Sequence, residues 1–305
     1  MKRNILITGG AGFIGSCFVK LWVEKYPDDL ILVLDKLTYA GNIANLNELI
    51  DRDKIVFVKG DINDSFLVDK LFKKYLINHI VNFAAESHVD RSINNPKCFL
   101  ETNILGTYSL LEIFRKNWKK NNKNQSWRFI QVSTDEVYGS LGEKQAPFEE
   151  STTYDPHSPY SASKASSDHL ALAWHHTYGI PLIVSNCSNN YGPFQYPEKL
   201  IPLSLINILK GDFVDVYGDG KNIRDWLYVE DHINALILIA LKAKKGSRFC
   251  IGGNNEITNI DICKKICQIL DELIPKKETY KNQIVFVKDR LGHDFRYAIN
   301  PELIS

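Results

Sequence analysis

Two adjacent carboxylates, Asp135 and Glu136, carry the most informative chemistry in this sequence. They follow an apolar stretch that is typical of a β-strand, within the segment Ser133–Gly139. In an open α/β sheet the carboxyl ends of the strands face the ligand crevice. Two like charges in a cleft repel each other, so we expect one carboxyl to stay protonated at neutral pH. Such a pair supplies one acid and one base, as the elimination of water requires. The alternative interpretation is two solvated loop acids.

A tyrosine and a lysine four residues apart form a second candidate group. Tyr160 and Lys164 stand at the start of a predicted helix, and a spacing of four places both on one helical face. A nearby ammonium stabilises a phenolate, which predicts a lowered pKa and a role as base for Tyr160. This spacing also arises by chance, so it gains weight only beside other evidence.

A glycine-rich turn joins the first predicted strand to a helix. Gly9, Gly12 and Gly15 give the pattern GxxGxxG, which permits a tight turn, close approach of a pyrophosphate and close helix packing. Asp35 ends the next strand, where a carboxylate binds adenosine ribose hydroxyls and favours NAD over NADP; the adjacent Lys36 weakens that preference. Asp61 and Ile62 follow the third strand, where the adenine edge is expected. A purely structural glycine turn is the alternative.

These residues need a scaffold, and the sequence predicts one in which strands alternate with helices. Nearly unbroken apolar strands of this kind favour a Rossmann-type, doubly wound parallel sheet, with helices on both faces. After about Ser185 the alternation weakens. We therefore expect residues 1–185 to form an NAD-binding domain. Residues 186–305 would be mainly a smaller, irregular nucleotide-sugar-binding part, with some segments returning to the core. The segment 116–126 is rich in Lys and Asn and is expected to be a solvated loop. The predicted strands are 4–8, 30–35, 55–59, 79–84, 128–133, 182–187 and 248–251, and the predicted helices are 13–25, 65–75, 102–119, 160–178, 200–210, 229–243 and 260–274.

Composition limits the class of protein. The 305 residues include 37 Lys and Arg against 36 Asp and Glu, a formal charge of +1, which gives no electrostatic footprint for nucleic acid or an anionic membrane. The apolar run Ile5–Ile7 is too short for a signal peptide, and Ala235–Leu241 is far too short for a membrane span. The six cysteines are scattered and show no metal-ligand spacing, so no metal site is predicted. We expect a cytoplasmic protein.

With these motifs in place, the chain resembles the extended short-chain dehydrogenase/reductase family, and within it the dTDP-glucose 4,6-dehydratases. The resemblance spans nearly the whole chain, and its segments occur in order. The ThrAspGlu triplet at Thr134–Glu136 separates these dehydratases from the related 4-epimerases, which lack the acid pair. Leu291 and Phe295 depart from the family pattern, which commonly has Pro and Arg there, and family chains usually continue with a further helix after the position of Ser305. The matching segments are Thr8–Gly15, Asp35–Asn42, Ala84–Ile93, Ser133–Gly139, Ser158–Asp168, Cys187–Pro193, Pro197–Pro202, Arg224–Asp231 and Asp289–Asp294.

The resemblance implies a carbon–oxygen lyase that converts dTDP-glucose to dTDP-4-keto-6-deoxyglucose and water, for deoxysugar synthesis such as that of rhamnose. Tyr160, assisted by Lys164, would take the C4 hydroxyl proton while hydride passes to NAD, and Thr134 would bind the C4 oxygen. Glu136 would remove the C5 proton, Asp135 would protonate the departing C6 hydroxyl, and hydride would return to C6.

The same resemblance implies ligand contacts, position by position. Arg224 and Arg290 suit a diphosphate because guanidinium is cationic and bidentate; surface salt bridges are the alternative. Tyr217 suits contact with a pyrimidine, and His293 is expected to be structural. The implied cofactor residues are Gly9, Gly12, Phe13, Ile14, Gly15, Asp35, Lys36, Leu37, Thr38, Asp61, Ile62, Phe83, Ala84, Ala85, Thr102, Tyr160, Lys164 and Asn190. The implied substrate residues are Ser87, Thr134, Asn189, Lys199, Leu200, Asp215, Val216, Tyr217, Arg224, Asn259, Arg290 and His293.

Three other functions stay open at this point. A nucleotide-sugar 4-epimerase would conserve the mass of the sugar, whereas a dehydratase would not. A non-catalytic NAD-sensing module would bind NAD without turnover. A sister dehydratase for GDP-mannose or CDP-glucose differs only in base recognition, which depends on loop shape. The family resemblance also implies a homodimer, formed through the helices predicted at 102–119 and 160–178.

Overall fold

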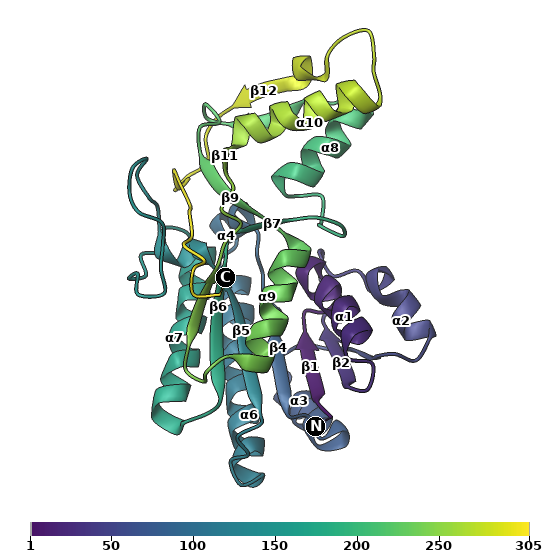
Figure 1. The fold of residues 1–305 in the computed structure, drawn as a ribbon, viewed down its shortest axis with the longest axis vertical. Coiled ribbons are helices and arrows are strands. Elements are labelled where there is room, and N and C mark those ends of the chain that lie inside the picture. The colour runs from purple at the N-terminus through teal and green to yellow at the C-terminus, as the bar shows by residue number, and fades with distance from the viewer. Residues whose placement is uncertain (1, 305) are drawn as a thin grey trace.

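A computed structural model describes residues 2–304, and its centre is a seven-stranded parallel sheet (Figure 1). The strand order is β10-β6-β5-β4-β1-β2-β3, and the order reverses between β4 and β1. This doubly wound sheet confirms the predicted fold class. Its strands are β1 (Asn4–Thr8), β2 (Leu30–Asp35), β3 (Val56–Lys59), β4 (His79–Asn82), β5 (Arg128–Thr134), β6 (Leu182–Cys187) and β10 (Arg248–Ile251).

The apolar strands explain why helices cover both faces of the sheet. Successive side chains of a strand point to opposite faces. Ile5 and Ile7 therefore lie in one core, whereas Leu6 lies in the other. The first core includes side chains of α1 (Phe13–Lys25) and α9 (Val229–Lys242), which pack against each other, and the second includes side chains of α3 (Ser65–Tyr75), α6 (Thr107–Lys120) and α7 (Pro159–Tyr178).

The C-terminal part forms a smaller lobe at one end of the sheet (Figure 1). A three-stranded sheet contains β7 (Asn189–Tyr191), β9 (Ile223–Tyr228) and β11 (Glu256–Thr258), and β8 (Val214–Tyr217) pairs in parallel with β12 (Ile284–Val287). The helices α8 (Leu200–Lys210) and α10 (Asn259–Leu273) share a core with β8. Both α9 and β10 return to the large sheet, and the predicted boundary between residues 185 and 186 falls inside β6. None of the helices within residues 2–304 is long and apolar enough to cross a membrane.

Several local predictions needed correction. The strand expected at 79–84 ends at Asn82, and residues 102–106 of the helix expected at 102–119 belong to a π-helical segment, Leu100–Gly106. The loop expected at 116–126 begins only after α6 ends at Lys120, because the buried Asn117 and Trp118 continue the apolar face of that helix. Five strands of three to six residues have no counterpart among the predicted ones: β7, β8, β9, β11 and β12.

Further short elements connect the main ones. They are η1 (Ile43–Leu46), α2 (Asn47–Asp51), α4 (Val89–Asn94), α5 (Lys97–Phe99), the π-helical η2 (Leu100–Gly106), η3 (Asp135–Tyr138) and η4 (Tyr280–Gln283).

Candidate active site

A cavity of about 780 Å³ runs from the glycine turn after β1 to the C-terminal lobe. Every predicted cofactor and substrate residue lines this cavity except Leu37. Leu37 packs against the core, has a left-handed φ of 55°, and donates its backbone N–H to Asp35. Leu37 does not line the cavity, and its predicted cofactor contact stays a prediction. Segments far apart in the sequence thus form one continuous site.

The glycine turn leaves the first helix open toward the cavity. Gly9 has a φ of +66°, and a Cβ there would lie 2.7 Å from the backbone nitrogen of Ala84. A Cβ on Gly15 would lie 2.3 Å from the carbonyl oxygen of Gly9. Gly12 is the N-cap residue of α1, and no side chain caps that helix. Its first N–H groups and positive dipole end are therefore available to a phosphate. This arrangement fits the pyrophosphate of a dinucleotide.

The carboxylate of Asp35 is fixed beside this turn. Its two oxygens accept the backbone N–H groups of Ala11 at 2.9 Å and Leu37 at 2.7 Å. Burial raises the pKa of Asp35, and these two hydrogen bonds act in the opposite direction. The neighbouring Lys36 pairs with Asp61 at 2.7 Å, which partly neutralises the cation that weakened the preference for NAD.

The remaining predicted cofactor residues enclose the middle of the cavity. Phe83, Ala84 and Ala85 line it from the loop after β4, and Thr102 lines it from the π-helical segment η2. The Oδ1 atom of Asn190 lies 2.9 Å from Nδ1 of the buried His232, and the amide group of Asn190 donates to the carbonyl oxygen of Ser188. These contacts hold Asn190 in one orientation at the cavity wall.

The acid pair stands where β5 ends and the single turn η3 begins. The side chain of Thr134 caps this turn by accepting the N–H of Glu136, and it donates to Asp135 at 3.3 Å. Asp135 is buried, and its Oδ2 atom has no hydrogen-bond partner within residues 2–304. Glu136 keeps some exposed surface along the cavity. The same turn therefore places the two carboxylates in unlike surroundings.

Burial, more than mutual repulsion, sets the proton affinities of the pair. Burial raises the pKa of Asp135 well above its usual range, and the charges of Glu136 and Asp225 add to this. Burial also raises the pKa of Glu136, whereas the positive charges of Lys199, Arg224 and Arg290 act in the opposite direction. This corrects the expectation that repulsion between the two carboxylates is the main cause. Asp135 is therefore the carboxyl that keeps its proton, and Glu136 is the one that three nearby cations help to ionise.

Tyr160 and Lys164 are held by the start of α7. Ser158 caps this helix reciprocally with Ser161, and the two predicted residues follow on the buried side. The Nζ atom of Lys164 donates to the carbonyl oxygen of Val132 at 2.7 Å. Burial raises the pKa of Tyr160 well above its usual range, and a hydrogen bond with Thr134 opposes this. The pKa of Tyr160 is therefore raised and not lowered as expected, because burial outweighs the effects that favour the phenolate.

Cationic side chains line the opposite end of the cavity. Arg224 is buried, and its hydrogen bonds within residues 2–304 go to the carbonyl oxygens of Ile223, Asp294 and Phe295, so it is not a surface salt bridge. Arg290 instead pairs with Asp90, with Nε 2.7 Å from Oδ1 and Nη2 3.0 Å from Oδ2. Lys199 donates to the carbonyl oxygen of Ser87 at 2.8 Å. The charge of Arg224 is thus left for a ligand anion.

The residues predicted to lie near a pyrimidine base are grouped around β8. Tyr217 lies edge-on to His293, with ring centroids 6.2 Å apart, and the guanidinium of Arg290 lies 5.1 Å from the Tyr217 ring. The Nδ1 atom of His293 lies 2.7 Å from Oδ1 of Asp289. In β8, Asp215 and Tyr217 are exposed, whereas Val216 is buried. Asn189, Leu200 and Asn259 complete the wall of the cavity at this end.

The chain is similar to known proteins over nearly its whole length. Residues 6–305 match the family model described as GDP-mannose 4,6 dehydratase. The dTDP-glucose 4,6-dehydratase of Shigella flexneri is 51% identical over 312 aligned residues, covering 99% of this chain and 86% of the relative. The chain belongs to the dTDP-glucose 4,6-dehydratase family. This confirms the family resemblance seen in the sequence.

Two solved structures of this family are close in shape. The dTDP-glucose 4,6-dehydratase from Bacillus anthracis, in complex with NAD, has a TM-score of 0.86 and 46% identity, and the comparison covers 99% of this chain and 89% of that one. The enzyme from Streptomyces venezuelae, with NAD and dTDP bound, has a TM-score of 0.90 and 43% identity, with the same coverage of 99% and 89%.

Three further residues in this family member line the cavity and were missed in the sequence. Glu198 accepts a hydrogen bond from the Tyr39 hydroxyl at 3.1 Å, and its Oε2 atom lies 3.4 Å from Nε of Arg91. Asp90 forms the ion pair with Arg290 described above. The ring of Tyr297 lies against the guanidinium of Arg224. Asp90 and Glu198 lie inside the family-like segments Ala84–Ile93 and Pro197–Pro202. An acidic residue within such a segment could therefore have been predicted to line the site. Tyr297 follows the last of these segments and gave no signal.

Proposed function

We propose that this chain converts dTDP-glucose to dTDP-4-keto-6-deoxyglucose and water, as a carbon–oxygen lyase that uses NAD. The observation that carries this reaction class is the acid pair at the end of β5. A buried carboxyl with a strongly raised pKa adjoins a carboxylate that three cations stabilise, next to Tyr160. Elimination of water needs one proton donor and one base at such a site. Family membership supports the substrate.

NAD fits the half of the cavity that contains the glycine turn. The uncapped end of α1 would bind the pyrophosphate, and Asp35 would bind the adenosine ribose. Bound there, NAD would supply the acceptor for hydride from C4 of the sugar and the donor of hydride to C6, and its oxidised ring would add positive charge to the cavity. The implied cofactor residues other than Leu37 would enclose it.

Tyr160, Lys164 and Thr134 would act on the C4 oxygen. Tyr160 removes the hydroxyl proton, and Thr134, which already bonds Tyr160, binds the same oxygen. Because burial opposes the phenolate, Tyr160 needs positive charge nearby, and Lys164 is the cation that this chain supplies. The Nζ atom of Lys164 is anchored by the carbonyl oxygen of Val132, which keeps the ammonium on the wall of the cavity.

Glu136 and Asp135 would perform the elimination. The ketone at C4 makes the C5 proton acidic, and Glu136 removes it while Lys199, Arg224 and Arg290 favour the carboxylate form. Asp135, which burial keeps protonated, gives its proton to the departing C6 hydroxyl. At the far end, Arg224 would bind the diphosphate, and Tyr217 would contact the base.

One experiment separates this reaction from the competing ones. The protein is incubated with NAD and dTDP-glucose carrying deuterium at C4, and the product is analysed by mass spectrometry and NMR. We expect loss of one water and deuterium in the new methyl group. A product of unchanged mass would indicate a 4-epimerase, and no turnover of any nucleotide-hexose would indicate an NAD-sensing module. Parallel incubations with GDP-mannose and CDP-glucose test the base preference.

The same proposal extends to assembly and cellular location. A homodimer is supported by large apolar side chains exposed along η2, α6 and α7, among them Leu105, Tyr108 and Tyr178. Apolar side chains gathered on neighbouring helices are typical of an interface.

Six cysteines without a disulfide support a reducing, cytoplasmic location. The division at residues 185 and 186 is proposed as a functional one, with cofactor contacts mainly before it and substrate contacts mainly after it.

A further inference from the structure

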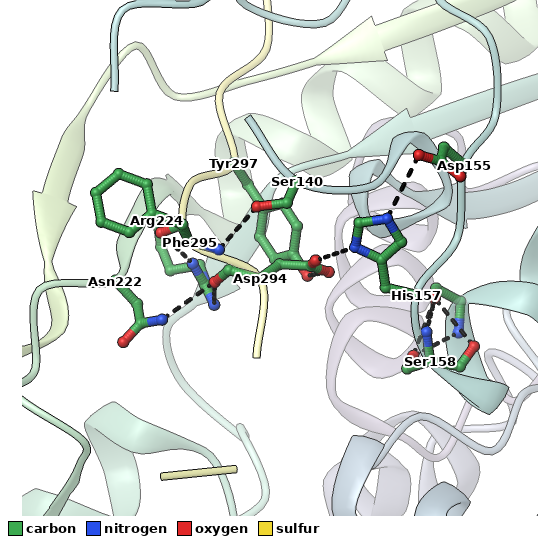
Figure 2. Close-up of polar contacts among 10 residues, drawn as sticks. Ser140, Asp155, His157, Ser158, Asn222, Arg224, Asp294, Phe295 and Tyr297 are labelled. Atoms are coloured by element: carbon green, nitrogen blue, oxygen red, sulfur yellow. Dashed lines mark hydrogen bonds and ion pairs between the residues drawn. The ribbon is translucent and has the colours of Figure 1, made fainter. Parts of the chain in front are cut away.

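A histidine outside the predicted site is tied to the substrate end of the cavity. The Nδ1 atom of His157 lies 2.6 Å from Oδ1 of Asp294, and Nε2 lies 3.4 Å from Oδ2 of Asp155 (Figure 2). The His157 side chain is 42% exposed, whereas that of Asp294 is only 6% exposed. A largely buried carboxylate thus receives its charged hydrogen bond from a residue that solvent reaches. His157 directly precedes Ser158, the capping residue of α7.

Asp294 connects His157 to Arg224 through a short series of contacts. Its second carboxylate oxygen accepts the Tyr297 hydroxyl at 2.5 Å, and its backbone oxygen accepts Arg224 Nη2 at 2.9 Å (Figure 2). The Arg224 guanidinium lies 4.3 Å from the centre of the Tyr297 ring. Both the stacking partner and one hydrogen-bond acceptor of Arg224 are therefore fixed by Asp294. The arginine has no carboxylate of its own within 4.0 Å in residues 2–304.

Asp294 also stands at a junction in the chain. After it, backbone hydrogen bonds secure the segment 295–300, for example from Leu141 to Arg296 and from Phe148 to Ala298. Before it, the segment 289–293 carries Arg290 and His293 into the cavity without belonging to a helix or strand. The His157 contact is placed where the fixed segment meets this loop.

We propose that His157 is a positioning residue for the nucleotide diphosphate: by pairing with Asp294 it holds Arg224 and the start of the 289–293 loop in the geometry that binds a nucleoside diphosphate. This inference rests on the proposed function for the identity of the nucleotide. His157 does not line the cavity and takes no part in proton transfer to the sugar.

Because His157 pairs with Asp294 in its charged form, the proposed effect on nucleotide binding should depend on pH. The charged groups facing it are Asp294 and Asp155, and the hydrogen bond with Asp294 is the main cause that raises the His157 pKa. The imidazolium form thus persists to higher pH than in an unpaired histidine, and the ion pair weakens as pH rises through the raised pKa. Within the cavity, burial lowers the pKa of His293, so its titration lies on the acid side.

The test compares His157→Ala and His157→Gln with a control, His176→Gln, which makes the same change at an exposed histidine in the last turn of α7. The NAD-loaded protein is titrated with dTDP by calorimetry over a range of pH, and KM and kcat for dTDP-glucose are measured alongside. Thermal unfolding of each variant checks the fold. For a charged hydrogen bond that is partly exposed, we expect His157→Ala to raise the Kd for dTDP and the KM roughly three- to tenfold.

We expect kcat to change by less than about twofold, since no group at the reacting carbons moves. The Kd of the unaltered protein should rise with pH through the raised His157 pKa, and His157→Gln should lack that rise. A Kd that is unchanged in His157→Ala, or a loss in kcat at constant KM, would overturn the inference. Failure of the unaltered protein to turn over dTDP-glucose would instead defeat the proposed function, while the dTDP titrations would still test His157.

Discussion

The Oδ2 atom of Asp135 lies buried without a hydrogen-bond partner in residues 2–304, whereas the adjacent Glu136 faces the positive charges of Lys199, Arg224 and Arg290. The backbone turn η3 separates the two side chains into these unlike surroundings. The roles proposed for the two carboxyls, one as proton donor and one as base, rest on this difference and lead to a separate prediction for each.

Replacing Glu136 with Gln should stop the reaction after oxidation. The amide cannot take the C5 proton, but Tyr160 and the cofactor site are unaltered, so absorbance of bound NADH should accumulate when dTDP-glucose is added. Loss of a general base lowers turnover by about 10²–10⁴-fold. Glu143→Gln, in an exposed loop, serves as the control. Full activity without a build-up of NADH would contradict the assignment.

Tyr160→Phe should abolish the oxidation itself. Without the phenol group nothing on α7 takes the C4 hydroxyl proton, so neither NADH nor product should form, and turnover should fall by about 10²–10⁴-fold. Stopped-flow absorbance of NADH measures the first step directly. Tyr228, which is exposed and does not line the cavity, gives a matched control, Tyr228→Phe. A near-normal rate of NADH formation in Tyr160→Phe would exclude a role for Tyr160 as base.

Asp135→Asn should matter most when the leaving group is poor. Hydroxide leaves slowly unless it is protonated, whereas fluoride needs little help. The ratio of rates for dTDP-glucose and its 6-fluoro analogue should therefore change by at least about tenfold between the variant and the unaltered protein. Steady-state assays of both substrates provide this ratio. Equal slowing of the two substrates would argue against Asp135 as the acid.

The same substitution should stabilise the fold at alkaline pH. Because the folded-state pKa of Asp135 is raised well above the unfolded value, its contribution to stability is present below about pH 4 and is lost as pH rises through the folded pKa. Asparagine does not ionise, so Asp135→Asn should be more stable at alkaline pH by on the order of 1–2 kcal/mol.

Urea unfolding at acidic and alkaline pH measures this difference. The gain should shrink as the pH falls below about 4, where the carboxyl of Asp135 is neutral in both the folded and the unfolded protein. The exposed Asp51→Asn is the control. An Asp135→Asn variant that is less stable than the unaltered protein at alkaline pH would show that the carboxylate is satisfied by contacts other than those described.

The sequence by itself determined the parts of this protein that depend on local spacing. The glycine turn, Asp35 at the end of β2 and the Tyr160–Lys164 spacing are set by neighbouring residues and by strand and helix periodicity. These signals were enough for the fold class, and they predict the cofactor half of the site. Family-like segments extended the prediction to most residues of the substrate half.

Only the tertiary structure decided which charges meet and how deeply each group is buried. Asp90 pairs with Arg290 across 200 residues, and the parallel strands β8 and β12 pair across about 70 residues, so no local pattern could reveal them. The proton affinities of Asp135 and Tyr160 follow mainly from burial. Burial is a property of the packed chain, because desolvation depends on every segment that excludes water from a group.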